Sequence, residues 1–200
     1  MRHALAPLTD EAFDRLIPED LRHLSNAHWT PLSVAVRAAS LLCPSGDARV
    51  LDLGCGIGKL CTVGALSRAG MWCGVEQHGS LVDGARELAH RLGVTSRTRF
   101  VHADAFSIDW SSYDALYLYN PFELALFEPD ARQLTHAEAV ARVEARLLEL
   151  RIGVRIVTLN GFGGVMPAGF RLVYHEHIAP IGLDLVLWVQ QGRRARTWMS

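Results

Sequence analysis

The stretch VLDLGCGIG, residues 50–58, places one carboxylate ahead of three glycines that are spaced two apart. Asp52 is the carboxylate, and Gly54, Gly56 and Gly58 are the glycines. Glycine adopts backbone conformations that other residues avoid, so the chain can turn tightly beneath a bulky ligand. Three ligand classes bind at such a turn before a helix: a nucleoside triphosphate, a dinucleotide and an adenosyl amino acid. The spacing of the glycines distinguishes these classes.

The patterns for a triphosphate and for a dinucleotide both fail. A P-loop requires GxxxxGK and then Ser or Thr, but Leu53 and Leu60 occupy its first and last positions. A dinucleotide fingerprint requires GxGxxG, and either Lys59 or Cys61 replaces its third glycine. We interpret Lys59 as an exposed residue in the first turn of the next helix. The remaining pattern suits a zwitterionic amino acid joined to a nucleoside, because Asp52 attracts an ammonium group and repels a pyrophosphate.

Two further carboxylates follow the next two predicted strands. Glu76 ends the strand predicted at 71–76, and Asp104 follows the strand predicted at 97–103. Because the carboxyl ends of parallel strands form the ligand crevice of such sheets, we expect these acids to face the same ligand. Glu76 can accept hydrogen bonds from both hydroxyls of a ribose. Asp104 can accept one from an adenine amino group, and the backbone N–H of Ala105 can donate to the ring.

The elements that position these residues alternate between apolar strand-like runs and helical patterns. This alternation predicts an α/β fold with a mostly parallel sheet covered by helices on both faces. The expected strands are 48–53, 71–76, 97–103, 113–119, 155–160, 170–178 and 183–190. The last two are joined by a short turn, so we expect an antiparallel pair, with the apolar 183–190 inside the sheet and the half-polar 170–178 at its edge.

Helical patterns fill the intervals between these strands. The leading segment, 9–42, has helical spacing of apolar residues, and within it Thr30 can cap a helix that begins at Pro31. Further helices are expected after the glycines, over about 81–92, and from THAE (135–138), which is a capping box.

Composition and charge limit the possible partners. Two hundred residues, half of them hydrophobic, suffice for one compact domain with a substantial core. The net charge of −1 argues against a nucleic-acid partner, because such binding requires clustered Lys and Arg. Arg193, Arg194 and Arg196 are interpreted as a solvated tail. The four cysteines lack zinc spacing and indicate a reducing compartment. We find no signal-peptide pattern and no apolar run near the ~20 residues that span a bilayer, so we expect a cytoplasmic protein without a membrane partner.

The motifs VLDLGCGIGKL, GVEQ and HADAF, together with the closing hairpin, resemble the class I S-adenosylmethionine-dependent methyltransferases. The resemblance extends from about residue 30 to 192 and implies a seven-stranded, mostly parallel Rossmann-like sheet with an antiparallel C-terminal pair and N-terminal helices. It implies a helical segment (1–47) packed on the core, a cofactor-binding methyltransferase domain (48–192) and a tail (193–200). The implied cofactor is S-adenosyl-L-methionine, with its methionine part held by Gly54, Cys55, Gly56 and Gly58, its ammonium by Asp52, its ribose by Glu76 and its adenine by Asp104 and Ala105.

The end of the fourth predicted strand, YLYNPFE, resembles the Asn-Pro-Pro-aromatic signature of amino-group methyltransferases that act on adenine or glutamine. Asn120 and Pro121 match, but the second proline is missing, so the aromatic Phe122 arrives one position early. The resemblance implies that the Asn120 side chain and the Pro121 carbonyl accept from a substrate nitrogen while Phe122 walls the pocket. HWTP resembles a helix-opening motif found beside the cofactor, which makes His28 and Trp29 expected lid residues.

Two functions remain open. The first is transfer of a methyl group, with nitrogen favoured as the nucleophile and a protein amine or a small molecule favoured as the acceptor. A partial likeness of LDLGCGIGKL and GVEQ to the non-SET histone-lysine methyltransferases favours a protein amine. The second is a non-catalytic S-adenosylmethionine-binding or scaffold protein with the same fold. His175 and His177 share one face of the predicted edge strand, but no third ligand is evident there, so we expect no metal site.

Overall fold

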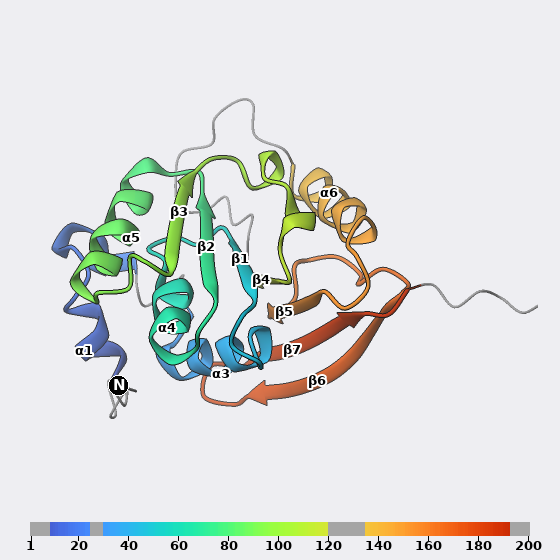
Figure 1. Cartoon of the computed structure of the whole chain (residues 1–200), viewed down its shortest axis with the longest axis horizontal. Helices are drawn as coiled ribbons and strands as arrows, with labels where there is room; N and C mark the ends of the chain where they lie inside the picture. Colours follow the sequence, from blue (N-terminus) through green and yellow to red (C-terminus); the bar gives the residue numbers. More distant parts are fainter. Residues whose placement is uncertain (1–8, 25–29, 120–134, 193–200) are drawn as a thin grey trace, which may run out of the picture.

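The computed structural model of the chain describes residues 9–24, 30–119 and 135–192. A seven-stranded sheet runs through the molecule in the order β3-β2-β1-β4-β5-β7-β6 (Figure 1). The strands are β1 (Arg49–Leu53), β2 (Met71–Glu76), β3 (Thr98–His102), β4 (Ala115–Tyr119), β5 (Arg155–Leu159), β6 (Phe170–Ile178) and β7 (Leu183–Gln190). The first five pair in parallel, and β7 is antiparallel to both β5 and β6. The predicted fold class is confirmed.

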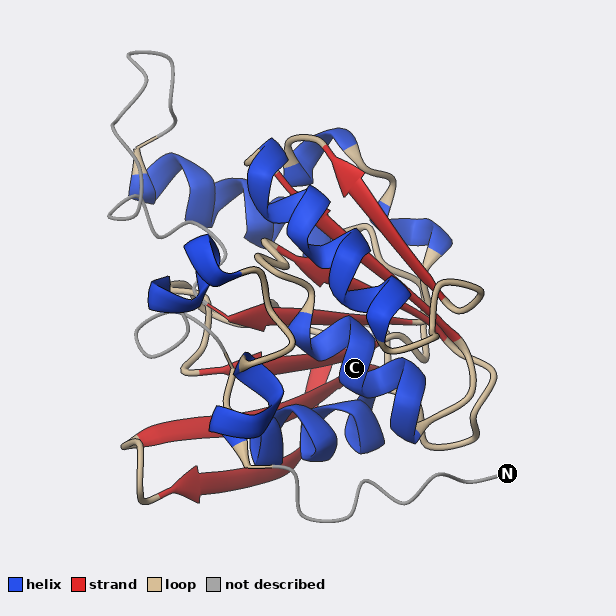
Figure 2. Cartoon of the chain, turned by 90° about the vertical axis from the view of Figure 1, so that its left-hand side faces the viewer, coloured by secondary structure: helices blue, strands red, loops and turns tan. Residues whose placement is uncertain are grey.

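Two layers of helices cover the sheet (Figure 1 and Figure 2). Buried side chains on one face pack against α3 (Leu32–Leu42), α4 (Lys59–Ser67) and α5 (Gly79–Arg91). The opposite face packs against α6 (His136–Leu148) and against the short 3-10 turns η2 (Ala105–Ser107) and η3 (Trp110–Ser112). Alternate residues of each central strand face opposite layers, which explains why these strands are apolar almost throughout.

The closing pair of strands lies where its side-chain pattern indicates. The apolar β7 lies between β5 and β6, while β6 forms the edge of the sheet. A register irregularity between Leu172 and Tyr174 interrupts the pairing of β6, and both Leu172 and Val173 are exposed. Such a bulge twists an edge strand and disfavours further strand pairing there.

The leading segment is less regular than predicted. It contains a five-residue helix, α1 (Asp10–Asp14), then the 3-10 turn η1 (Glu19–Leu24), and then α3. Thr30 does not cap α3; its hydroxyl forms a 2.9 Å hydrogen bond with the hydroxyl of Tyr117 on β4. Phe13 and Ile17 are fully buried, so the segment is held by packing on the core rather than by helix propensity. The domain boundaries at 47/48 and 192/193 stay a prediction.

The predicted capping box of α6 is confirmed. The Glu138 N–H donates to the Thr135 hydroxyl, and the Thr135 N–H donates to the Glu138 carboxylate at 2.8 Å. Residues 193–200, including the three tail arginines, lie outside the described residues. Among the helices that the structure describes, none has the length and apolar content needed to cross a bilayer.

Candidate cofactor and acceptor site

The glycine loop between β1 and α4 is fastened to the end of β2. Gly54, Gly56 and Gly58 all have positive φ, at 70°, 52° and 71°. The backbone N–H groups of Gly54 and Cys55 both donate to the carbonyl of Val75, each at 3.0 Å. These left-handed conformations fold the loop back over the neighbouring strand, which only glycine tolerates at little cost.

Glu76, at the end of β2, organises the same loop with its side chain. One of its carboxylate oxygens accepts from the Gly56 N–H and the other from the His78 N–H, both at 3.0 Å. The side chain is buried. An ionised carboxylate has about four acceptor positions, so Glu76 retains capacity for two further donors, such as the hydroxyls of a ribose.

Asp52, near the end of β1, is a buried acid with an unusual environment. Burial raises its pKa to about 7; a hydrogen bond from the Cys61 thiol acts in the opposite direction, and the nearby charge of Glu76 raises the pKa further. The Cys61 sulfur lies 3.8 Å from the carboxylate. Within the described residues no ion pair forms at Asp52. Two buried acids without a described cation fit a ligand that brings its own ammonium group, as S-adenosylmethionine does.

Asp104 follows β3 and lies beside the Glu76 backbone, because the Ala103 N–H donates to the Glu76 carbonyl at 3.0 Å. The exposed carboxylate of Asp104 accepts from the Phe106 N–H at 2.9 Å, which caps η2. The Ala105 carbonyl accepts from the indole N–H of Trp110 at 2.9 Å. The Asp104 side chain is therefore oriented by the turn and also remains open to solvent.

The structure brings most of the predicted cofactor residues to one edge of the sheet. At the carboxyl ends of β1, β2 and β3 lie Asp52, Gly54, Cys55, Gly56, Gly58, Glu76, Asp104 and Ala105. The other predicted residues lie outside the described residues: Trp29, His28, Asn120, Pro121 and Phe122. The part played by each of these residues stays a prediction.

The interpretation of Lys59 as an exposed residue is wrong. Its side chain is 5% exposed, and its ammonium nitrogen lies 2.5 Å from an Asp10 oxygen and 3.4 Å from an Asp14 oxygen. Helix α1 packs over the first turn of α4 and encloses the lysine. One signal was available in the sequence: α4 reads KLCTVGALS, in which apolar residues occur all round the helix rather than along one stripe, as is typical of a buried helix.

The pair of histidines on β6 has a third neighbour that the sequence did not reveal. Asp184 on β7 pairs in register with His177, and one of its oxygens lies 3.0 Å from His175 Nε2 and 3.1 Å from His177 Nδ1. These hydrogen bonds lower the pKa of Asp184. Among the described residues, no group of three acidic, histidine or cysteine side chains has an arrangement that could hold a metal ion.

Comparison with known proteins identifies the family to which this sequence is similar. The sequence matches the family described as "Methyltransferase domain" over residues 50–145. A 23S rRNA (uracil(1939)-C(5))-methyltransferase of Bordetella avium is 31% identical over 149 residues, which are 74% of this chain and 30% of that protein. The enzyme of the same name from Nitrosospira multiformis is 39% identical over 75 residues, 38% of this chain and 17% of that protein.

Solved structures share the fold. An RNA methyltransferase from Salinibacter ruber, in complex with S-adenosyl-L-homocysteine, superposes with a TM-score of 0.64 at 20% identity. The superposition covers 86% of this chain and 99% of that chain. The chain belongs to the class I S-adenosylmethionine-dependent methyltransferases, whose methyl donor is S-adenosyl-L-methionine. It spans less than a third of the length of the two curated relatives named above.

The expectation that excluded a nucleic-acid partner is wrong. The curated relatives are named as 23S rRNA methyltransferases, so a nucleic acid is the acceptor class to which the comparisons point. The net charge of −1 misled because it sums the whole chain, whereas contacts to phosphate depend on the local arrangement of basic groups. The protein amine and the small molecule that the sequence favoured receive no support from the comparisons.

Proposed function

We propose that this methyltransferase transfers a methyl group to a nitrogen atom of a base in RNA. The names of the curated relatives and of the Salinibacter ruber structure support RNA as the acceptor. The curated relatives are named for methylation of a uracil carbon. We favour a nitrogen acceptor instead because every cysteine in the chain is buried. An RNA acceptor also fits the cytoplasm, the compartment that the unpaired cysteines favour.

Carbon and nitrogen acceptors demand different chemistry from the protein. The C5 atom of uracil has no lone pair, so its methylation requires a nucleophile that first adds to C6 and makes C5 electron-rich. After C5 takes the methyl group, a base removes the C5 proton and the nucleophile is expelled. A base nitrogen carries or readily develops a lone pair, takes the methyl group directly and loses a proton to water. A nitrogen acceptor therefore needs no covalent nucleophile.

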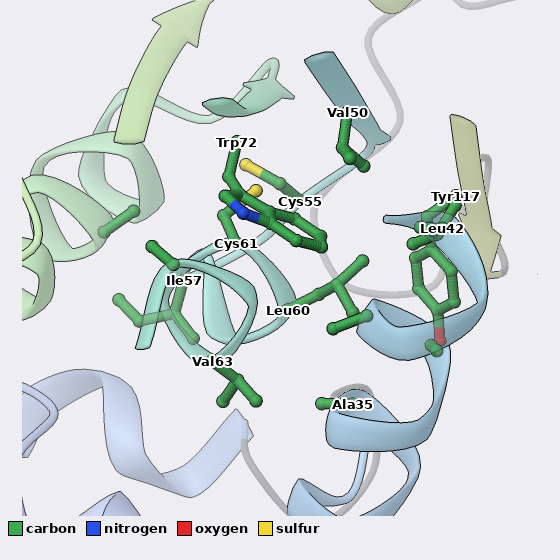
Figure 3. Packing of buried hydrophobic residues seen from close by; sticks show 14 of the residues in the cluster. Ala35, Leu42, Val50, Cys55, Ile57, Leu60, Cys61, Val63, Trp72 and Tyr117 are labelled. Carbon is green, nitrogen blue, oxygen red and sulfur yellow. The ribbon is translucent and has the colours of Figure 1, made fainter. Parts of the chain in front are cut away.

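None of the four cysteines is placed to act as that nucleophile. Cys43, Cys55, Cys61 and Cys73 are at most 8% exposed. Cys55 and Cys61 lie in the apolar cluster around Trp72 (Figure 3). Burial raises the pKa of Cys55, Cys61 and Cys73, so their thiols stay protonated at neutral pH.

The residues of this chain would act mainly by positioning. S-adenosylmethionine supplies an electrophilic methyl group when it is bound. Asp52 and Glu76 would hold its ammonium and ribose from the ends of β1 and β2. Asn120 and the Pro121 carbonyl would accept hydrogen bonds from the acceptor nitrogen, while Phe122 walls the pocket. Such alignment of reacting atoms can contribute roughly 7–11 kcal/mol, and no strong general base is required.

A label experiment tests both parts of this proposal. The chain is incubated with methyl-tritiated S-adenosylmethionine and fractionated lysate, and we expect the label in RNA rather than in protein or small molecules. Digestion to nucleosides should then yield an N-methylated base. In parallel, RNA that carries tritium at C5 of its pyrimidines should release no tritium into water. Label in protein would contradict the RNA acceptor, whereas release of C5 tritium would contradict the nitrogen acceptor and leave RNA intact. Bound cofactor without any transfer would favour the scaffold function.

A further inference from the structure

Lys59 is the only lysine of the chain, and it lies at the junction of the glycine loop and α4. Two acids of α1 enclose its ammonium group, with Asp10 at 2.5 Å and Asp14 at 3.4 Å. The same nitrogen lies 5.3 Å from the centre of the Phe13 ring, close enough for a cation–π contact. Every described partner of the lysine ammonium group therefore comes from the N-terminal segment.

Asp10 joins three helices through one oxygen. That oxygen accepts from the Lys59 ammonium on α4 and also from the Leu32 N–H, at 2.8 Å, at the start of α3. Helix α1 has only five residues, which is too short for stability by itself. Its position must therefore depend on these tertiary contacts and on the burial of Phe13 and Ile17.

The other end of this linkage is the cofactor loop. Gly58, directly before Lys59, is in the left-handed conformation and donates to the Cys55 carbonyl at 2.8 Å. A Cβ atom on Gly58 would lie 2.4 Å from the Phe100 ring, so the junction has no room to shift toward the sheet. A displacement of the first turn of α4 would consequently move the loop that carries Gly56 and its hydrogen bond to Glu76.

We propose that Lys59 and Asp10 are positioning residues for the cofactor. Through them, docking of residues 9–24 on α4 and binding of the cofactor to the 54–58 loop stabilise each other. Linkage makes this coupling reciprocal: the segment raises cofactor affinity by the same factor by which the cofactor favours docking of the segment. The inference concerns the cofactor site of the class and does not depend on the acceptor being RNA.

The test measures both directions of the coupling on the full chain, with S-adenosylhomocysteine as the probe. Calorimetry gives its dissociation constant, and hydrogen exchange reports the protection of residues 9–24 with and without it. In the wild type we expect the probe to slow exchange in this segment. Lys59→Gln should weaken binding by about tenfold, within the usual range of such couplings, and should abolish the effect of the probe on the segment.

Two further variants keep the test decisive. Asp10→Asn leaves Asp14 beside the lysine, so it should fold even if Lys59→Gln does not, and it should reduce both effects partially. Asp83→Asn breaks an exposed ion pair with Arg86 on α5 and should change neither quantity. The double variant Asp10→Asn/Lys59→Gln should bind no more weakly than Lys59→Gln alone.

Two results would overturn the proposal. The first is an unchanged dissociation constant in a folded Lys59→Gln variant, even if hydrogen exchange in residues 9–24 becomes faster. The ion pair would then stabilise the segment without affecting cofactor binding. The second is additive loss of affinity in the double variant, which would mean that the two residues act separately.

Discussion

The backbone N–H of Gly56 donates to a carboxylate oxygen of Glu76 at 3.0 Å. This hydrogen bond joins the loop after β1 to the end of β2, so the groups expected to hold the methionine and ribose parts of the cofactor form one unit. The Glu76 carboxylate therefore holds the glycine loop through Gly56 and is also expected to bind the ribose of the cofactor.

Glu76→Gln should therefore weaken cofactor binding in two ways. It removes the charged acceptor expected for the ribose hydroxyls, and it also disturbs the hydrogen bonds that hold the loop. The amide has one oxygen for two backbone donors, so its NH₂ group must face the N–H of Gly56 or of His78. Loss of a hydrogen bond to a charged group costs about 1.5–3 kcal/mol, which corresponds to roughly 10–150-fold in affinity. Calorimetric titration with S-adenosylhomocysteine measures the change. An unaltered dissociation constant would remove Glu76 from the site.

The raised pKa of Asp52 makes the stability of the free protein depend on pH. The folded-state pKa is about 7, against an ordinary Asp value of 3.8, so between these pH values the native state binds more protons than the unfolded state. The free energy of unfolding should fall as pH rises from about 4 to about 7, by a few kcal/mol, and then level off. Asp52→Asn should remove this slope and make the free protein more stable at pH 8. Denaturant unfolding at a series of pH values checks both, and an equal slope in the variant would refute the assignment.

Cofactor affinity should show the opposite trend with pH. An ammonium group binds best to the ionised carboxylate, so affinity should increase as pH rises toward the Asp52 pKa of about 7. Binding below pH 7 should release protons into the buffer, which calorimetry in buffers of different ionisation enthalpy detects. In the Asp52→Asn variant the cofactor affinity should be low at every pH. The increase of affinity with pH and the release of protons on binding should both be absent. Proton release that persists in the variant would point to another group.

Substitution of Gly58 should be far more harmful than substitution of another left-handed glycine. Gly93 has φ 66° and no neighbour within 4 Å of an added Cβ, so Gly93→Ala should cost only about 1–2 kcal/mol of backbone strain. Gly58→Ala should cause similar backbone strain, and its Cβ atom would also lie 2.4 Å from the Phe100 ring. This overpacking should lower the free energy of unfolding by about 1–3 kcal/mol more. The denaturant midpoints of Gly58→Ala and Gly93→Ala measure the two losses of stability. Equal losses would mean that Phe100 can move aside.

Asn120→Ala should reduce turnover far more than cofactor affinity. If Asn120 accepts from the acceptor nitrogen, its removal affects alignment of the reacting atoms and leaves the cofactor contacts of β1 to β3 intact. Single-turnover rates with methyl-labelled donor, beside calorimetry with S-adenosylhomocysteine, separate the two effects. A parallel loss of both would indicate that Asn120 supports the cofactor instead.

Strand positions followed closely from local pattern. The runs predicted at 71–76, 170–178 and 183–190 match β2, β6 and β7 end to end. Parallel pairing then brings Asp52, Glu76 and Asp104 to one edge whatever the details of packing. The prediction that excluded a nucleic-acid partner was wrong, because the net charge of a chain does not show where its basic groups lie.

The sequence by itself determined the order of elements, the sheet edge at which the three acids lie and the left-handed turn between β1 and α4. These features depend on periodicity and on glycine, both of which act over a few residues. Only the tertiary structure decided that Lys59 is buried against Asp10, 49 residues away, and that Asp184 joins His175 and His177. It also decided that Thr30 binds Tyr117 rather than capping a helix. Such pairings depend on how segments distant along the chain pack together, and local patterns do not encode that choice.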